Sequence, residues 1–472
     1  MPNHLWMQED HKAFADTVRR DTIEQSVATL VLSGDTQSYF SLPAGPIGFA
    51  VGGEFRFEES VSRPAVADGL GLTFGNVLGV TEGNFNVYEG FAEVSIPVLA
   101  DLPAVEQLVV EAAGRISDYN SIGGTETWMV RGDWTPVSDI RFRVTYSEAI
   151  RAPNISELFS PQDQNFFDVN DPCSTENLGD AVDPALRAAN CAALGAPPGF
   201  VSTADAATIP GVSGGNPLLM EESAESLTIG AIITPRWLPG FSLTVDYWDI
   251  EITDAISPVG EQAILDRCVD SPGGIDNQFC PLITRDGQFE ITNITQIEQN
   301  LQKLEASGID VEMNYNLELA DLGAGDWGTV DFRFIGTWVD TLREFPFQDE
   351  PVQDNEVGEL GDPEFAFNLN TTWNWNGLQV NYELRWFDSM LREDDDEIDA
   401  VRPDRRDPLT TGGTFFHDIQ VNYQLNEYLQ LYGGVNNIAD KLPPGGTSAT
   451  NDDGAIFDNI GRFFFFGARG TF

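Results

Sequence analysis

Long runs of strictly alternating apolar and polar residues constrain this sequence more than any other feature. From Ile309 to Leu319, apolar side chains at odd positions alternate with polar or acidic ones, and 365–375, 378–386 and 418–425 follow the same pattern. Because successive side chains of a β-strand point to opposite faces, the pattern predicts strands with one apolar and one polar face. The runs are about 10–13 residues long, which exceeds the usual globular strand and suits a tilted membrane-spanning strand.

Two kinds of connection join the predicted strands. Asn376-Gly377 is a hairpin signal, since both turn positions favour a positive φ. Other short turns fall near 135–138, 235–239 and 426–427, and long connections separate them at 150–220, 254–297, 342–361, 391–412 and 438–459. An outer-membrane barrel alternates short periplasmic turns with long extracellular loops. We count about fifteen strands, which begin near residues 25, 45, 85, 106, 124, 139, 221, 239, 298, 329, 363, 378, 413, 428 and 460.

Aromatic residues gather next to the short turns. Trp134, Trp237, Trp327, Trp373 and Tyr423 all lie within a few residues of such a turn. A barrel carries a ring of aromatic residues where it crosses the membrane–water interface. The alternative is the core of a soluble β-sandwich, but that fold does not explain strands of this length with a face rich in Asn, Gln and Asp.

The charge of the chain excludes one class of partner. The formal net charge is -50, from 75 acidic and 25 basic residues, so we expect no nucleic-acid binding. Glu393–Glu397 is the densest acidic run, and we interpret it as a solvated loop because it lacks the central glycine of a calcium loop. The three histidines, His4, His11 and His417, leave little material for catalysis or metal binding. We expect no catalytic site, no metal and no cofactor.

The four cysteines fall in pairs within two long connections. Cys173 and Cys191 lie in one connection, and Cys268 and Cys280 lie in another. None of them belongs to a Cys-x-x-Cys motif, so a zinc or redox site is disfavoured. We predict two local disulfides that close surface loops, with free thiols as the alternative. Such disulfides indicate an oxidising compartment.

Two motifs resemble those of a known family. The first ends a strand and enters a long loop, and the second lies at the penultimate strand, where Ile438 replaces the usual Leu. Both resemble segments of TonB-dependent outer-membrane receptors. The matching residues are Arg151, Ala152, Pro153, Glu157, Leu158 and Phe159 in the first motif, and Asn437, Asp440 and Lys441 in the second.

The resemblance implies an all-β fold, an antiparallel transmembrane β-barrel. Such a receptor barrel has about 22 strands, of which we expect about 15 here. Family members also carry a signal peptide, a TonB-contact motif and a plug domain, and the sequence shows none of them. We therefore expect 1–24 to be an uncertain start and 25–472 to be the C-terminal portion of a receptor barrel, a fragment without a plug domain.

The same resemblance implies a function, a location and partners. The chain would be the barrel part of a receptor for energy-coupled uptake of a nutrient such as a siderophore, a vitamin or a saccharide. The resemblance places the chain in the outer membrane of a Gram-negative bacterium, in contact with lipid and with an unknown extracellular ligand. The TonB complex would act only through a plug domain. The terminal Phe472 would be part of the signal that the barrel-assembly machinery reads, and Phe457 is expected in the last extracellular loop.

Two other functions remain open. A passive porin-like barrel is the first, although the receptor-type motifs and an odd number of strands disfavour it. A secreted soluble β-rich protein is the second, and dependence on detergent during purification would separate it from either barrel.

Overall fold

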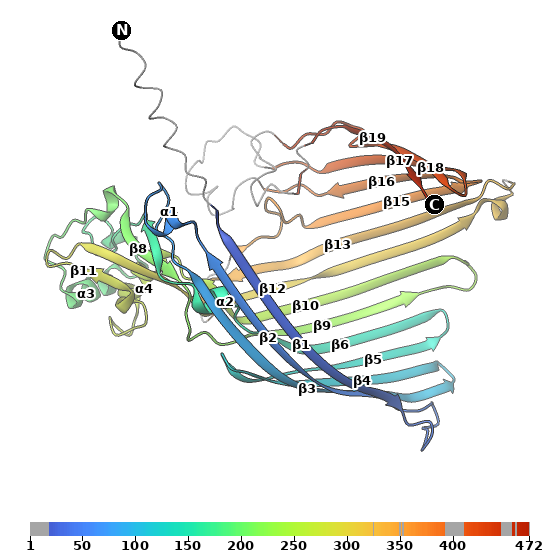
Figure 1. Ribbon diagram of the computed structural model, residues 1–472, viewed down its shortest axis with the longest axis horizontal. Coiled ribbons are helices and arrows are strands. Elements are labelled where there is room, and N and C mark those ends of the chain that lie inside the picture. The colour runs from blue at the N-terminus through green and yellow to red at the C-terminus, as the bar shows by residue number, and fades with distance from the viewer. Residues whose placement is uncertain are drawn as a thin grey trace, which may run out of the picture.

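A computed structural model describes residues 18–323, 325–348, 351, 354–391, 410–444, 456–457 and 460–471. The chain forms one curled β-sheet of 19 strands (Figure 1). Four of them are short and lie beyond the wall, and the other fifteen form its antiparallel ladder, which confirms the expected number. The wall strands are β1 (Arg20–Asp35), β2 (Gly48–Arg63), β3 (Thr81–Leu102), β4 (Val105–Tyr119), β5 (Gly123–Val137), β6 (Ile140–Arg151), β9 (Glu222–Ile233), β10 (Phe241–Pro258), β12 (Ile291–Glu318), β13 (Thr329–Phe345), β15 (Phe365–Trp375), β16 (Leu378–Phe387), β17 (Thr414–Asn426), β18 (Leu429–Asn436) and β19 (Phe463–Gly470).

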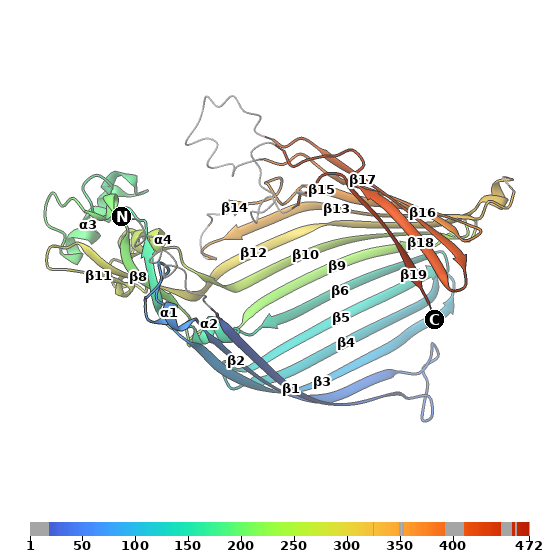
Figure 2. The ribbon, with the colours of Figure 1, turned by 45° about the horizontal axis from the view of Figure 1, so that its top comes forward.

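Neighbouring wall strands pair in chain order. Where a long loop intervenes, β6 pairs with β9, β10 with β12, and β13 with β15. Figure 2 shows the sheet curving round, with β1 and β19 at its two edges. Among the described residues no ladder joins these two edges. None of the described helices has the length and apolar composition needed to cross a membrane.

The cross-strand register separates two faces of the wall. Met313 of β12 lies opposite Leu243 and Phe334, so these apolar side chains share one face. The next residue, Asn314, lies opposite Ser242 and Arg333 on the other face. An outer-membrane barrel presents its apolar face to lipid and its polar face to the lumen, so the alternation in the sequence assigns both.

Two aromatic girdles bound the apolar face. The turn-side girdle includes Trp134 stacked on Phe142 at 5.5 Å and Trp373 stacked on Trp375 at 6.0 Å. The loop-side girdle lies toward the long loops and includes Trp128 with Tyr146, Tyr247, Trp338, and Trp386 with Phe415. Two such belts are the arrangement of a barrel at both membrane interfaces.

The turn at Asn376-Gly377 has the predicted geometry. Asn376 and Gly377 have φ of 45° and 80°, as the turn between β15 and β16 requires. One predicted boundary is wrong, because the connection at 254–297 is shorter. β10 continues to Pro258 and β12 begins at Ile291, since both strands extend beyond the wall into a folded loop region.

That region is a lobe built from two long loops, at the left of Figure 1. Residues 160–221 and 259–290 pack around one apolar core that includes Phe167, Ile264, Leu265 and Ile294. β8 pairs in parallel with β12 at Ile294–Ile297, which fastens the lobe to the wall. Its elements are β7 (Asp163–Phe167), η2 (Leu178–Asp180), α3 (Pro184–Leu194), η3 (Ala204–Ala206), β8 (Ile209–Gly214), α4 (Glu261–Asp270), η4 (Cys280–Leu282) and β11 (Ile283–Arg285); elsewhere lie α1 (Val66–Gly69), α2 (Ile155–Phe159), η5 (Leu319–Leu322) and β14 (Asp354–Asn355).

Candidate functional site: the loop-side mouth and the lumenal wall

Arg151 links four elements at the rim of the wall. It is the last residue of β6, and its Nε and Nη2 donate to Glu222 of β9 at 2.5 and 2.6 Å. Its Nη1 donates to both carboxylate oxygens of Glu157 in α2 at 3.0 Å. Glu222 also accepts from the backbone N–H of Ile256 in β10 at 2.8 Å. A planar guanidinium suits this use, because it binds two carboxylates with paired, charge-assisted hydrogen bonds.

The rest of the first motif places α2 beside the wall. Asn154 caps the helix, since its Oδ1 accepts from the N–H of Glu157 at 2.9 Å while Glu157 accepts from the N–H of Asn154 at 2.7 Å. Leu158 is 1% exposed, and Ile155 packs with Phe85 and the neighbouring strand. Pro153 is buried at the point where β6 ends, and Ala152 and Phe159 border the same apolar cluster.

One glycine makes room for α2. A Cβ built at Gly83 of β3 would lie 2.3 Å from the ring of Phe159 and 3.0 Å from Ile155. Real atoms do not approach so closely, so only glycine allows the helix to sit against β3 at this point. The sequence gives no signal for this requirement, because Gly83 lies inside an ordinary strand pattern.

Both predicted cysteine pairs are bonded in the lobe. Cys173 joins Cys191 of α3, and Cys268 of α4 joins Cys280, with Cα–Cα distances of 5.5 and 4.6 Å. The two loops are not separate, as the local pairing would suggest, because all four cysteines border one shared core. The predicted disulfides therefore act within a single folded lobe.

An ion-pair cluster joins the two long helices of the lobe. Arg187 of α3 is buried and donates to both oxygens of Asp270 in α4, at 2.7 and 2.5 Å, and to Asp266 at 3.0 Å. The hydrogen bond with Asp270 raises the pKa of Arg187, so the guanidinium group stays positively charged. Burial raises the pKa of Asp266 above the ordinary range of an aspartate. The cluster holds α3 against α4 across two loops that are far apart in sequence.

The second motif closes the end of β18. Asn437 is 1% exposed and has a φ of 51°. Its side chain donates to the carbonyl of Lys441 at 2.6 Å and accepts from the N–H of Lys441 at 2.7 Å. Asp440 accepts from the N–H of Arg462 at 2.7 Å. The motif therefore shapes the chain reversal between β18 and β19, and Phe472 lies outside the described residues.

Charged side chains form a ladder on the polar face of the wall. Asp133 of β5 pairs with Arg131 at 2.9 Å and with Arg141 of β6 at 2.6 Å. Arg143 of β6 pairs with Asp246 of β10 at 2.5 Å. The ladder keeps these charges compensated in the lumen, and it rests on pairings between strands that a single-strand pattern does not reveal.

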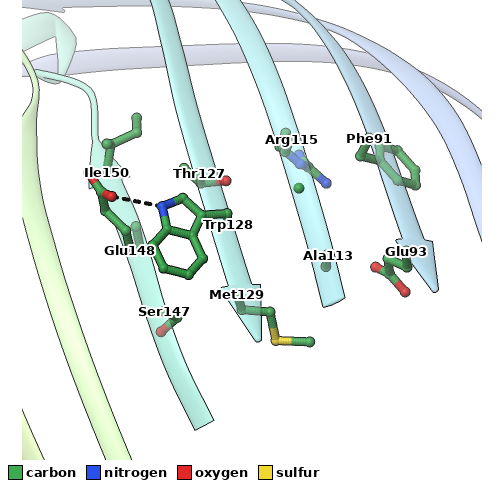
Figure 3. Close-up of a pocket in the computed structure, with 12 residues that line it drawn as sticks. Phe91, Glu93, Ala113, Arg115, Thr127, Trp128, Met129, Ser147, Glu148 and Ile150 are labelled. Atoms are coloured by element: carbon green, nitrogen blue, oxygen red, sulfur yellow. Dashed lines mark hydrogen bonds between the residues drawn. The ribbon is translucent and has the colours of Figure 1, made fainter. Parts of the chain in front are cut away.

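A recess of about 280 Å³ lies in the wall between this ladder and the rim (Figure 3). Ala113, Thr127 and Ser147 give it a floor of small side chains. Arg115 lies over the ring of Phe91 at 5.0 Å and pairs with Glu89 at 3.1 Å. On the opposite face of β5, Trp128 donates to Glu148 at 2.8 Å, as Figure 3 shows. The recess therefore combines small neutral side chains with charged ones, Glu93 and the paired Arg115 among them.

The described ranges contain no grouping of three His, Cys, Asp or Glu side chains that could hold a metal ion. The acidic run Glu393–Glu397 lies outside them. Phe457, expected in the last extracellular loop, lies in the long connection between β18 and β19. Its side chain is 2% exposed and packs with Met390 and Phe416, a contact that the sequence pattern did not indicate.

The comparisons with known proteins agree with this architecture. A family model described as TonB dependent receptor-like, beta-barrel matches residues 4–438. A search of the curated proteins finds no match. Among solved structures, the siderophore receptor PirA from Acinetobacter baumannii matches with a TM-score of 0.60 and 13% identity over 96% of this chain and 55% of that one.

Two further receptors give similar matches. The ferric enterobactin receptor PfeA from Pseudomonas aeruginosa has a TM-score of 0.60 and 14% identity, over 96% of this chain and 54% of that one. The FrpB iron transporter from Neisseria meningitidis has a TM-score of 0.52 and 11% identity, over 95% and 55%. The chain thus spans little more than half the length of these structures, and at such identity they show the fold alone. By its family match, the chain belongs to the TonB-dependent receptor β-barrel family.

Proposed function

We propose that this chain forms barrel wall and ligand-facing loops of an outer-membrane receptor that imports a scarce nutrient when coupled to TonB. The observation that carries the proposal is the co-occurrence of a two-faced antiparallel wall with a preorganised lobe above its mouth. A passive pore needs the wall, whereas a receptor needs rigid extracellular groups that select a ligand. The family membership supports the same proposal.

The motif residues have a positioning role in this proposal. Arg151, Glu157 and Glu222 hold the base of the lobe and the start of β9 in fixed relation to the wall. Asn437, Asp440 and Lys441 fix the reversal between the last two strands. TonB would act through a plug domain, which is not among the described residues, and residues 25–472 would be the C-terminal portion of the receptor.

Iron–siderophore complexes are the first ligands to test, because the similar solved structures are named as siderophore receptors and an iron transporter. The experiment compares a strain with and without this gene, each in a TonB-competent and a TonB-deficient background. Radiolabelled ferric enterobactin, cobalamin and a maltooligosaccharide serve as separate probes.

The proposal expects uptake of one probe to depend on both the gene and TonB. Uptake that depends on the gene and not on TonB would support the porin-like alternative. Protein that fractionates as soluble without detergent would support the soluble alternative and contradict an outer-membrane location.

A further inference from the structure

The apolar face of the wall carries a small polar patch. In the described strands from β5 to β17, most lipid-facing positions between the two girdles are apolar or glycine, and Tyr315 of β12 is an isolated exception. Three further exceptions lie on adjacent strands: Thr371 of β15, Tyr382 of β16 and His417 of β17. Here we call these three residues the polar patch.

The three residues form one contiguous group. Thr371 and Tyr382 lie directly opposite each other in the β15–β16 ladder. The Tyr382 hydroxyl and His417 Nδ1 are 2.7 Å apart, and the rings of Phe415 and Tyr382 both stack beside the imidazole. Trp386 and Phe415 mark the loop-side girdle on these strands, and Trp373 and Tyr423 mark the turn-side girdle. The patch therefore lies at hydrocarbon depth.

The hydrogen bond between Tyr382 and His417 leaves at least one donor or acceptor of the polar patch without a partner among the described residues, whichever tautomer His417 adopts. If the tyrosine donates to Nδ1, then Nε2 carries a proton that has no acceptor among the described residues. If Nδ1 donates to the tyrosine, then Nε2 is an acceptor without a donor, and the phenolic proton also lacks a partner. No water reaches these groups in hydrocarbon, so each unsatisfied group costs free energy that a purely apolar wall avoids.

We infer that the polar patch is the centre of a contact between two copies of this chain within the membrane. A second copy is the occupant that the groups fit, because the patch contains both a donor and acceptors and is therefore complementary to itself. All copies insert with the same sidedness, so two copies can pair only about an axis normal to the membrane. An axis that passes close to the patch brings the Tyr382–His417 pair of one copy next to the same pair of the other, because the Tyr382 hydroxyl and His417 Nδ1 are only 2.7 Å apart.

The surroundings of the patch favour the same contact. Phe365, Phe367, Trp386 and Phe415 form a connected aromatic cluster on the same face, with ring centroids 5.4–6.2 Å apart. Flat aromatic groups around a few hydrogen-bonding groups are typical of the centre of a protein interface. The nearest strand of the patch, β17, is separated from β19 by β18, so this contact leaves the edge of the sheet free.

Photo-crosslinking in isolated outer membranes tests the inference, which rests on the proposed outer-membrane location. A benzophenone amino acid replaces Leu384, the lipid-facing residue opposite His417. The matched control carries the same probe in place of Val245, which faces lipid on the distant strand β10. We expect an adduct of twice the chain mass from the first probe and lipid adducts alone from the second.

The double variant Tyr382→Phe with His417→Leu keeps an apolar wall while it removes the hydrogen-bonding groups. It should lower the homodimer adduct at least tenfold and leave insertion unchanged. Lipid adducts alone from both probes, equal homodimer adducts from both, or an adduct with a different protein would each overturn the contact. Absence of lipid adducts from both probes would contradict the outer-membrane location itself, and would remove the basis of the contact with it.

Discussion

Arg151 and Gly83 act at the scale of single residues, and they do so in opposite ways. Arg151 supplies charge and hydrogen bonds that join β6, α2 and β9. Gly83 supplies only space, since any side chain there would overlap Phe159. The role of Arg151 can be anticipated from the residue type, because an arginine at a strand end needs hydrogen-bond acceptors. The role of Gly83 depends on which helix the fold brings next to β3.

Gly83→Ala should loosen α2 from the wall. The added methyl group overlaps the Phe159 ring, and overpacking of this kind costs about 1–3 kcal/mol. Hydrogen exchange should show faster exchange of the α2 amides, while the amides of β12 keep their protection. Gly179→Ala is the control, because a Cβ there meets nothing within 4 Å. Equal effects of the two variants would contradict the packing argument.

Asp266 and Asp270 contact the same arginine, yet their replacement should have different effects. Asp270→Asn removes the paired hydrogen bonds of the buried Arg187 and should weaken the α3–α4 contact by about 1–3 kcal/mol. Asp266→Asn should leave the contact at least as stable at neutral pH, because the substitution removes a carboxylate whose charged form is disfavoured by burial. Hydrogen exchange of the α3 and α4 amides measures the free energy of opening of the α3–α4 contact in each variant.

The pH dependence follows from the raised pKa of Asp266. Above the ordinary aspartate pKa of about 3.9, the unfolded lobe releases this proton more readily than the folded lobe does. The folded lobe then binds more protons, so this group's contribution to stability falls as the pH rises from about 4. Asp266→Asn should remove that part of the slope. A slope that does not differ between wild type and Asp266→Asn would show that Asp266 titrates normally.

At the scale of the element, each wall strand carries two functions on alternate residues. In β12, Met313 pairs with apolar partners and Asn314 with polar ones, so neighbouring residues belong to lipid and to lumen. The register that fixes this assignment is shared by the whole ladder, and a shift of one residue would exchange the two faces. A single strand therefore constrains all of its neighbours.

Met313→Arg and Asn314→Arg should separate the two faces. An arginine at the lipid face costs about 2–4 kcal/mol near the middle of the membrane, whereas at the lumenal face it remains hydrated. The stability of each variant is measured by urea titration of the protein folded in detergent. The folded fraction at each urea concentration is read from the heat-dependent gel mobility of the barrel. Comparable losses for the two substitutions would show that the faces are assigned wrongly.

At the scale of the whole molecule, the lobe is a second folded unit beyond the wall. Two loops separated by β9 and β10 share one apolar core, one ion-pair cluster and a parallel pairing with β12. Because β12 runs without interruption from the lobe into the wall, the lobe is held at a fixed position above the mouth. A ligand that contacts the lobe therefore meets a preorganised surface.

The disulfides should be required for that rigidity. Peptide mapping without reductant should recover Cys173 linked to Cys191 and Cys268 linked to Cys280. Cys268→Ser with Cys280→Ser should destabilise the lobe by about 2–4 kcal/mol and expose it to protease, while the wall remains resistant. Free thiols at all four positions, or pairs that cross between the loops, would contradict the arrangement of the lobe.

The sequence by itself determined the wall. The alternation of apolar and polar residues along 309–319, and along the other segments with this pattern, assigned the two faces of the wall. Asn376-Gly377 marked a turn. Both features depend only on local backbone geometry. Only the tertiary structure decided what the loops do. That 160–221 and 259–290 share a core, that Glu222 and Glu157 are the partners of Arg151, and that Thr371, Tyr382 and His417 meet on the lipid face all depend on which strands become neighbours. Contacts between distant segments leave no periodic signal in either segment, so no local pattern can report them.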